Sequence, residues 1–184
     1  MAGTSSGIVA GLTAAAVATV GFLAFQASAD APAHLSGRPG PSASRAAAAK
    51  APRDKRHPTA LPRLSGKGER VVYSVDDDRV WLVGENNKVQ RTFKVIPGNV
   101  DPVPGTYPVM SRSNAVTGTD GTPVEHVVRF TTVGEVVIGF SAAVDGSAPL
   151  PDPTLKTGGV RETRRDGLAM WNFATIGVPI VVIR

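Results

Sequence analysis

Six short runs rich in Val, Ile, Tyr and Phe constrain the fold of this chain most. They read RVVYSVD, RVWLVG, KVQRTFKVI, TYPVMS, EHVVRFTT and EVVIGF, and they lie between Arg70 and Phe140. Several alternate apolar and polar residues, which is the period of a β-strand with one buried face. Residues that favour turns separate the runs at 76–78, 84–87, 119–121 and 133–134. The pattern predicts a mainly-β domain.

One helix is predicted near the C-terminus, from about Arg164 to Ala174. Thr163 can accept a hydrogen bond from the first turn, and Asp166 suits the positive end of the helix. Gly177 ends the helix, and the run 178–183 reads as a last strand. A proline at the second position of that run confines the start of the strand to an edge or to its first residues.

The N-terminal segment 1–29 is predicted to be a signal peptide or a membrane anchor. Residues 8–25 carry no charge, and Ala27-Ser28-Ala29 fits the small-x-small pattern of signal cleavage. An uncleaved helix would instead contact the membrane through residues 8–25, and a buried core helix is a third alternative. No Lys or Arg precedes the run and Arg38 follows it, which by the positive-inside rule favours a cytoplasmic C-terminal part. The apolar run and cleavage pattern nevertheless favour an extracytoplasmic protein, membrane-anchored or secreted.

Residues 30–65 are predicted to form a disordered linker, and 66–184 a folded domain. The linker has six prolines and no aromatic residue, so it can bury little apolar surface. It also holds seven Lys and Arg against two acids, whereas 66–184 holds thirteen of each sign. The net charge of +5 therefore belongs to the linker. A nucleic-acid-binding domain would carry such an excess on its fold, so no nucleic-acid partner is expected.

The chain contains no cysteine. It therefore has no disulfide, no thiolate metal site and no cysteine nucleophile. His126 is the one histidine of 66–184, and the scattered acids give no metal-ligand spacing. No glycine-rich phosphate loop follows a strand. Neither a metal nor a cofactor is expected.

The order of the segments resembles the catalytic domain of the L,D-transpeptidases (the YkuD-like family). The likeness covers about Glu69 to Arg184 and rests on VVYSVDDDRVWLVGENNKVQRTFKVIPG, on VPGTY at 103–107 and on VRETRRDGLAMWNFATIGVPIVVI. Those bacterial envelope enzymes crosslink peptidoglycan stem peptides through an acyl-enzyme on a cysteine. The resemblance implies a β-sandwich or barrel with one short helix near its C-terminus. It also implies peptidoglycan or an envelope protein as the partner.

The resemblance fails at the family's catalytic positions. The family motif is a histidine, then about fourteen to seventeen residues, then Ser/Thr-His-Gly-Cys-x-Arg/Asn. In this chain Arg161 matches the arginine and Gly158 the glycine, but Gly159 falls on the nucleophilic cysteine. Thr157 falls on the second histidine, and Ser141 on the base histidine. Thiolate acyl transfer needs a nucleophile and a base within hydrogen-bond reach, so the likeness predicts an inactive relative.

Three functions remain open. An inactive binding protein would use Arg161, with Gly158 and Ser141 beside it, to hold a peptide carboxylate. The favoured alternative for Arg161 is that it braces the loop by bonding backbone carbonyls or an acid. An active acyltransferase or hydrolase would use Ser141 as nucleophile, with His126 and Asp145 as partners. A structural envelope domain would have no ligand at all.

Overall fold

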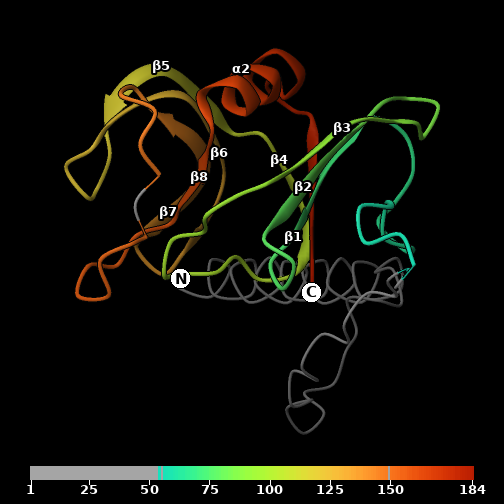
Figure 1. Ribbon diagram of the computed structural model, residues 1–184, viewed down its shortest axis with the longest axis horizontal. Helices are drawn as coiled ribbons and strands as arrows, with labels where there is room; N and C mark the ends of the chain where they lie inside the picture. Colours follow the sequence, from blue (N-terminus) through green and yellow to red (C-terminus); the bar gives the residue numbers. More distant parts are fainter. Residues whose placement is uncertain (1–53, 55, 149) are drawn as a thin grey trace, which may run out of the picture. The chain divides into compact units, whose positions relative to one another are not determined.

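The computed structural model describes residues 54, 56–148 and 150–184 (Figure 1). The predicted signal peptide or anchor (1–29) and residues 30–53 and 55 of the predicted linker lie outside the described residues. Two β-sheets and the helix α2 (Arg164–Phe173) form the described domain. Within these residues no helix has both the length and the apolar composition to cross a membrane.

The first sheet has the strand order β3-β2-β1-β9-β4. Its strands are β1 (Arg70–Ser74), β2 (Arg79–Val83), β3 (Val89–Lys94), β4 (Gly105–Pro108) and β9 (Pro179–Ile183). The second sheet has the order β5-β6-β7-β8, with β5 (Ser111–Thr117), β6 (Pro123–Val133), β7 (Val136–Ala143) and β8 (Gly159–Glu162). Two pairs are parallel, β1 with β9 and β7 with β8, and the other pairs are antiparallel. The predicted mainly-β class, with one short helix, is confirmed.

Aromatic and branched side chains fill the space between the two sheets. Tyr73 of the first sheet meets Phe140 of the second edge to face, with ring centroids 5.6 Å apart. Phe140 in turn stacks on Phe130 at 5.3 Å. Helix α2 packs on β6 and β7 and buries Met170 in the same core (Figure 1). Burying such large side chains is the main contribution to the stability of the domain.

Strand β1 is buried on both faces, which explains why its sequence RVVYS does not alternate. Val71 and Tyr73 point into the core between the sheets. Val72 lies on the other face, in a second cluster with Trp81, Val83 and Ile183. An apolar sheet face is stable only when it is shielded from water, and residues 59–65 shield part of this one.

The end of the predicted linker contacts the second cluster. Leu61 packs against it, and the Trp81 indole N–H donates to the Thr59 carbonyl at 2.8 Å. The Arg70 guanidinium donates to the Ser65 carbonyl at 2.6 Å. The domain boundary at residue 66 stays a prediction, but these contacts favour a domain that starts before Thr59.

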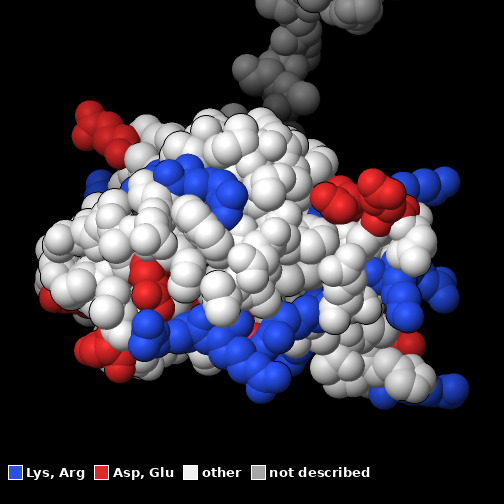
Figure 2. Space-filling view, turned by 90° about the horizontal axis from the view of Figure 1, so that it is seen from above, with Lys and Arg blue, Asp and Glu red and all other residues white. Residues whose placement is uncertain are grey.

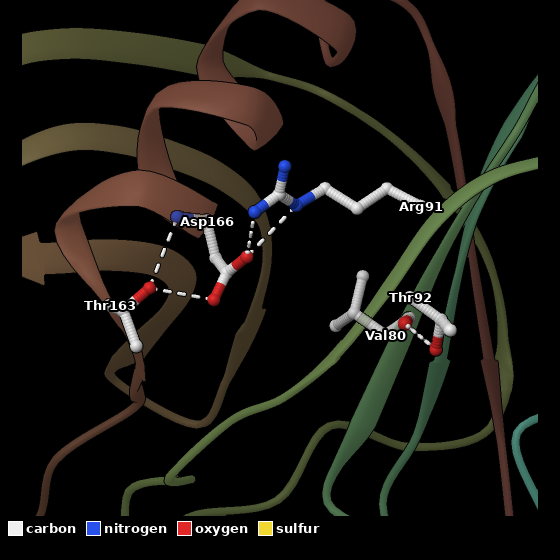
Figure 3. Close-up of polar contacts among 5 residues, drawn as sticks. All are labelled: Val80, Arg91, Thr92, Thr163 and Asp166. Atoms are coloured by element: carbon white, nitrogen blue, oxygen red, sulfur yellow. Dashed lines mark hydrogen bonds and ion pairs between the residues drawn. The ribbon is translucent and has the colours of Figure 1, made fainter.

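The first turn of α2 is held by its cap and by the first sheet (Figure 3). The Thr163 hydroxyl accepts from the Asp166 N–H at 3.2 Å and donates to the Asp166 carboxylate at 2.6 Å. Arg91 of β3 donates to the same carboxylate through Nε at 2.9 Å and through Nη2 at 2.6 Å. The predicted cap is confirmed, and the contact with β3 adds a polar link between the first sheet and α2. On the neighbouring strands, Thr92 donates to the Val80 carbonyl at 2.8 Å.

Two strands have no counterpart among the six predicted runs. Strand β5 reads SRSNAVT, which has no apolar face that would predict a strand, and the structure shows it largely exposed. Strand β8 has four residues and begins at the second glycine of a Gly-Gly pair, a sequence that predicts a turn.

Figure 2 shows charges of both signs on one face of the domain, with Lys and Arg side chains in a row along one side.

Candidate functional site

The parallel pair β7–β8 places the candidate residues on one face of the second sheet. Gly139 pairs with Gly159, and Ser141 with Arg161. Because side chains alternate along a strand, these four residues face the same way. Their neighbours Phe140 and Val160 point into the core.

The outer face of the second sheet carries a pocket of about 140 Å³. Strands β5 to β8 form its floor, and three loops form its rim: residues 96–97, 118–120 and 151–157. It is lined by Ile96, Pro97, Val116, Thr117, Gly118, Thr119, Asp120, Val124, Val127, Arg129, Val137, Gly139, Ser141, Pro151, Thr157, Gly159 and Arg161. Four of the lining residues are predicted candidates: Ser141, Thr157, Gly159 and Arg161. We call it the Ser141–Arg161 pocket.

Arg161 contacts three other residues that line the pocket. Its Nη1 donates to the Ser141 hydroxyl at 2.7 Å, and its Nη2 contacts the Asp120 carboxylate at 2.7 Å. Its main chain pairs with Ile96 in both directions, because the Arg161 N–H donates to the Ile96 carbonyl at 2.7 Å and the Ile96 N–H donates back at 2.9 Å. The side chain therefore links β8 to the loop that carries Asp120. The carboxylate that Arg161 contacts is thus the side chain of Asp120 and not a ligand.

Asp120 is held in its ionised form. Burial disfavours its charge, but hydrogen bonds from the Thr122 N–H and the charge of Arg161 outweigh that cost and lower the pKa of the carboxyl. The residue lies in the hairpin between β5 and β6, which the sequence predicts only as a turn. It is separated from Arg161 by 41 residues, so no local pattern reveals the pair.

The two glycines of the Gly-Gly pair have different surroundings. A Cβ on Gly158 would lie 2.4 Å from the Val137 carbonyl oxygen, so only glycine fits there. A Cβ on Gly159 would meet nothing within 4 Å, and the φ of this residue is outside the left-handed region. Gly159 therefore opens onto the pocket, whereas Gly158 packs against β7 and does not line it.

Thr157 is fixed through its main chain. Its N–H donates to the Asn99 side-chain carbonyl at 2.8 Å, and its carbonyl accepts from the Val100 N–H at 3.1 Å. The Asn99 amide also donates to the Asp152 carbonyl at 3.1 Å and to the Leu155 carbonyl. Asn99 thus fixes the loop that leads into β8. No sequence pattern marks Asn99 as part of a site.

The structure does not bring His126 and Asp145 to Ser141. His126 lies at a β-bulge in β6 with a φ of 54°, and its ring packs on Trp171 at a centroid distance of 5.8 Å. Asp145 accepts from the Ser147 N–H at 2.9 Å in an exposed loop. Neither residue lines the Ser141–Arg161 pocket. In the described part of the chain, no three residues of the His, Asp and Glu types are grouped closely enough to hold a metal ion.

Glu162 lies on the opposite face of β8, beneath the first turn of α2. It is 2% exposed, and neither carboxyl oxygen has a hydrogen-bond partner among the described residues. Burial, followed by the nearby charge of Asp166, raises the pKa of this carboxyl well above its usual range. A buried group of this kind is stable as the neutral acid. It is separated from the pocket by the sheet.

The chain matches no protein-family model and no curated protein. Among solved structures it is similar to an L,D-transpeptidase from Mycobacterium smegmatis, at 17% identity and a TM-score of 0.51, over 65% of this chain and 60% of that one. It is also similar to an L,D-transpeptidase from Stackebrandtia nassauensis, at 16% identity and a TM-score of 0.51, over 73% of this chain and 59% of the other. The chain thus spans about 60% of the length of these structures. The described domain has the fold of the L,D-transpeptidases.

Proposed function

We propose that this protein is a catalytically inactive relative of the L,D-transpeptidases that binds peptidoglycan peptides, or an envelope partner, without crosslinking them. The observation that carries the proposal is the composition of the Ser141–Arg161 pocket. The three positions that the sequence resemblance assigns to the family's histidines and cysteine all line it, and they hold Ser141, Thr157 and Gly159. No described histidine lines the pocket, and the chain has no cysteine.

The chemistry of the lining supports binding rather than acyl transfer. An acyl-enzyme needs a nucleophile and a base that takes its proton. The Ser141 hydroxyl accepts from a guanidinium, and an arginine cannot act as that base because it stays protonated. The same guanidinium, the hydroxyl and the apolar walls can hold a peptide end.

A proposed location follows from the same function. A wall-binding protein acts outside the cytoplasm, as the apolar run at 8–25 predicts. A reporter fused after Arg184 tests this location, and an active reporter in the cytoplasm would contradict it.

Retention on purified sacculi tests binding. We expect the full chain to be retained and the Arg161→Gln variant to be retained less. Arg165→Gln is the matched control, because Arg165 is exposed on α2 and does not line the pocket. If the full chain is not retained, peptidoglycan is not the partner, and an envelope partner or the structural-domain alternative replaces it.

Covalent probes test catalysis on the same preparations. We expect no acylation by carbapenems and no labelling of Ser141 by a fluorophosphonate. Labelling that Ser141→Ala abolishes would instead establish the hydrolase alternative.

A further inference from the structure

We propose that the Ser141–Arg161 pocket binds a carboxylate on a short apolar chain, and that this ligand takes the place of Asp120 on Arg161. Asp120 would then act as an internal occupant of Arg161 until an external carboxylate competes for the arginine. The inference deepens the proposed function and rests on it only in using the same pocket.

Arg161 offers the geometry that a carboxylate needs. Its two terminal nitrogens point to two oxygens, the Ser141 hydroxyl and the Asp120 carboxylate, each at 2.7 Å. A guanidinium fork binds a carboxylate at two points, and Lys cannot replace it in this respect. The Ser141 hydroxyl accepts from Arg161 and keeps its own hydrogen as a donor. An entering carboxylate can thus take Nη2 with one oxygen and the Ser141 hydroxyl with the other.

Asp120 is placed so that it can leave without unfolding the sheet. The hairpin that carries it is closed by two bonds of its own, from the Gly118 N–H to the Thr122 carbonyl at 2.8 Å and from the Gly121 N–H to the Gly118 carbonyl at 3.0 Å. One Asp120 oxygen accepts from the Thr122 N–H at 3.1 Å, and the other reaches Arg161. Its side chain is 26% exposed, whereas that of Arg161 is 10% exposed. Rotation of one side chain at the loop tip therefore frees the arginine.

The lining favours an anion with an apolar substituent. Asp120, Arg129 and Arg161 are the charged residues of the lining, so the departure of Asp120 leaves two guanidinium groups and no acid. Val116, Val124 and Val137 supply apolar walls. The volume of about 140 Å³ limits the ligand, or the part of it that enters, to a few carbon atoms.

Propionate and its neutral isostere propionamide test this proposal in NMR titrations of the full chain at low ionic strength. We expect propionate, but not propionamide, to shift the resonances of Ser141 and Arg161. Asp120→Asn removes the internal competitor and should tighten propionate binding by about fivefold, the scale of a partly exposed ion pair. Asp145→Asn makes the same charge change on an exposed loop and should leave the affinity unchanged.

Arg161→Gln should weaken propionate binding by about tenfold or more. Since this variant could also perturb the loop, the Asp120→Asn result decides the proposal independently. An affinity for Asp120→Asn equal to that of the parent, or equal shifts from propionamide, would overturn it. Sacculus retention separates the two proposals: retention without propionate binding contradicts only the carboxylate site, and propionate binding without retention contradicts only the wall function.

Discussion

The Asp166 carboxylate on α2 accepts two hydrogen bonds from one guanidinium, that of Arg91 on β3. The two residues are 75 positions apart in the sequence. Their contact joins the first sheet to the helix that packs on the second. Asp166 also bonds the hydroxyl of the cap residue Thr163. One carboxylate thus fixes the start of α2 and its position relative to β3.

A double-mutant cycle on Arg91 and Asp166 should show this coupling. We expect Arg91→Gln and Asp166→Asn each to lower the free energy of unfolding, with a coupling of about 1 kcal/mol because the bond is charge-assisted and partly buried. Urea unfolding gives the four free energies. Fully additive effects would mean that Arg91 adds nothing to the position of the helix.

The two adjacent glycines should respond oppositely to the same substitution. Gly158→Ala puts a methyl group against the Val137 carbonyl and should destabilise the domain by about 1–3 kcal/mol. Gly159→Ala enters open space in a strand and should leave stability within about 0.5 kcal/mol of the parent, or raise it slightly. Thermal unfolding of the two variants compares them directly. Equal losses would contradict the different surroundings described here.

The catalytic positions can be refilled to test whether the scaffold is intact. Gly159→Cys alone should not react with a carbapenem, because no described histidine lines the pocket and most of the thiol stays protonated. The triple variant Ser141→His, Thr157→His, Gly159→Cys should be acylated slowly. Because the φ of Gly159 lies outside the left-handed region, a cysteine side chain at this position adds no backbone strain. Mass spectrometry detects the adduct, and acylation of the unmodified chain would contradict its proposed inactivity.

The buried Glu162 carboxyl should make the domain less stable as pH rises. Because its folded-state pKa is raised, the folded protein holds a proton that the unfolded chain loses near the ordinary glutamate pKa. This contribution is full below that ordinary value and is lost as pH rises through the folded-state pKa. Glu162→Gln stays neutral and should remove that part of the slope. Urea unfolding from pH 4 to 8 measures it, and Glu85→Gln, in an exposed turn, is the control that should keep the slope.

Residues 59–65 should contribute to the stability of the domain. A fragment that begins at Gly66 loses the acceptor of the Trp81 indole and the Leu61 cover, and it should be less stable than one that begins at Asp54 by about 1–3 kcal/mol. Limited proteolysis of the full chain offers a second measurement. Cleavage between Thr59 and Ser65 that leaves stability unchanged would support the predicted boundary at residue 66.

The strands with apolar content and the cap of α2 could be predicted because their signals are local. Alternation in EHVVRFTT marks β6, and Thr163 followed by Asp166 marks the helix start. Strand β5 could not be predicted, because it has few apolar side chains and no buried face. It is a strand because its backbone pairs with that of β6, which its own sequence does not reveal. Strand β8 was hidden because a Gly-Gly pair ordinarily predicts a turn.

The residues of the site could be predicted only where they align with the motif of the L,D-transpeptidase family. Ser141, Thr157, Gly159 and Arg161 follow from the spacing of a known motif, and the structure places all four around one pocket. Asp120 follows from no such spacing, since its contact with Arg161 depends on how a hairpin folds over the sheet. Buried Glu162 was equally hidden, because a glutamate in a short polar segment ordinarily predicts an exposed position.

The parallel pairing of β1 with β9 determines when the first sheet can be completed. Strand β9 comes after every other described strand in the sequence, and it lies between β1 and β4 in the sheet. During synthesis, β1 to β4 therefore emerge long before the strand that separates β1 from β4, and β1 has an unpaired edge until then. Long-range pairing of this kind slows folding and exposes strand edges to aggregation. Because β4 pairs with β9 in the first sheet, β4 of the described domain has no neighbour in that sheet until β9 is in place, so its position depends on a strand that is made after all the others.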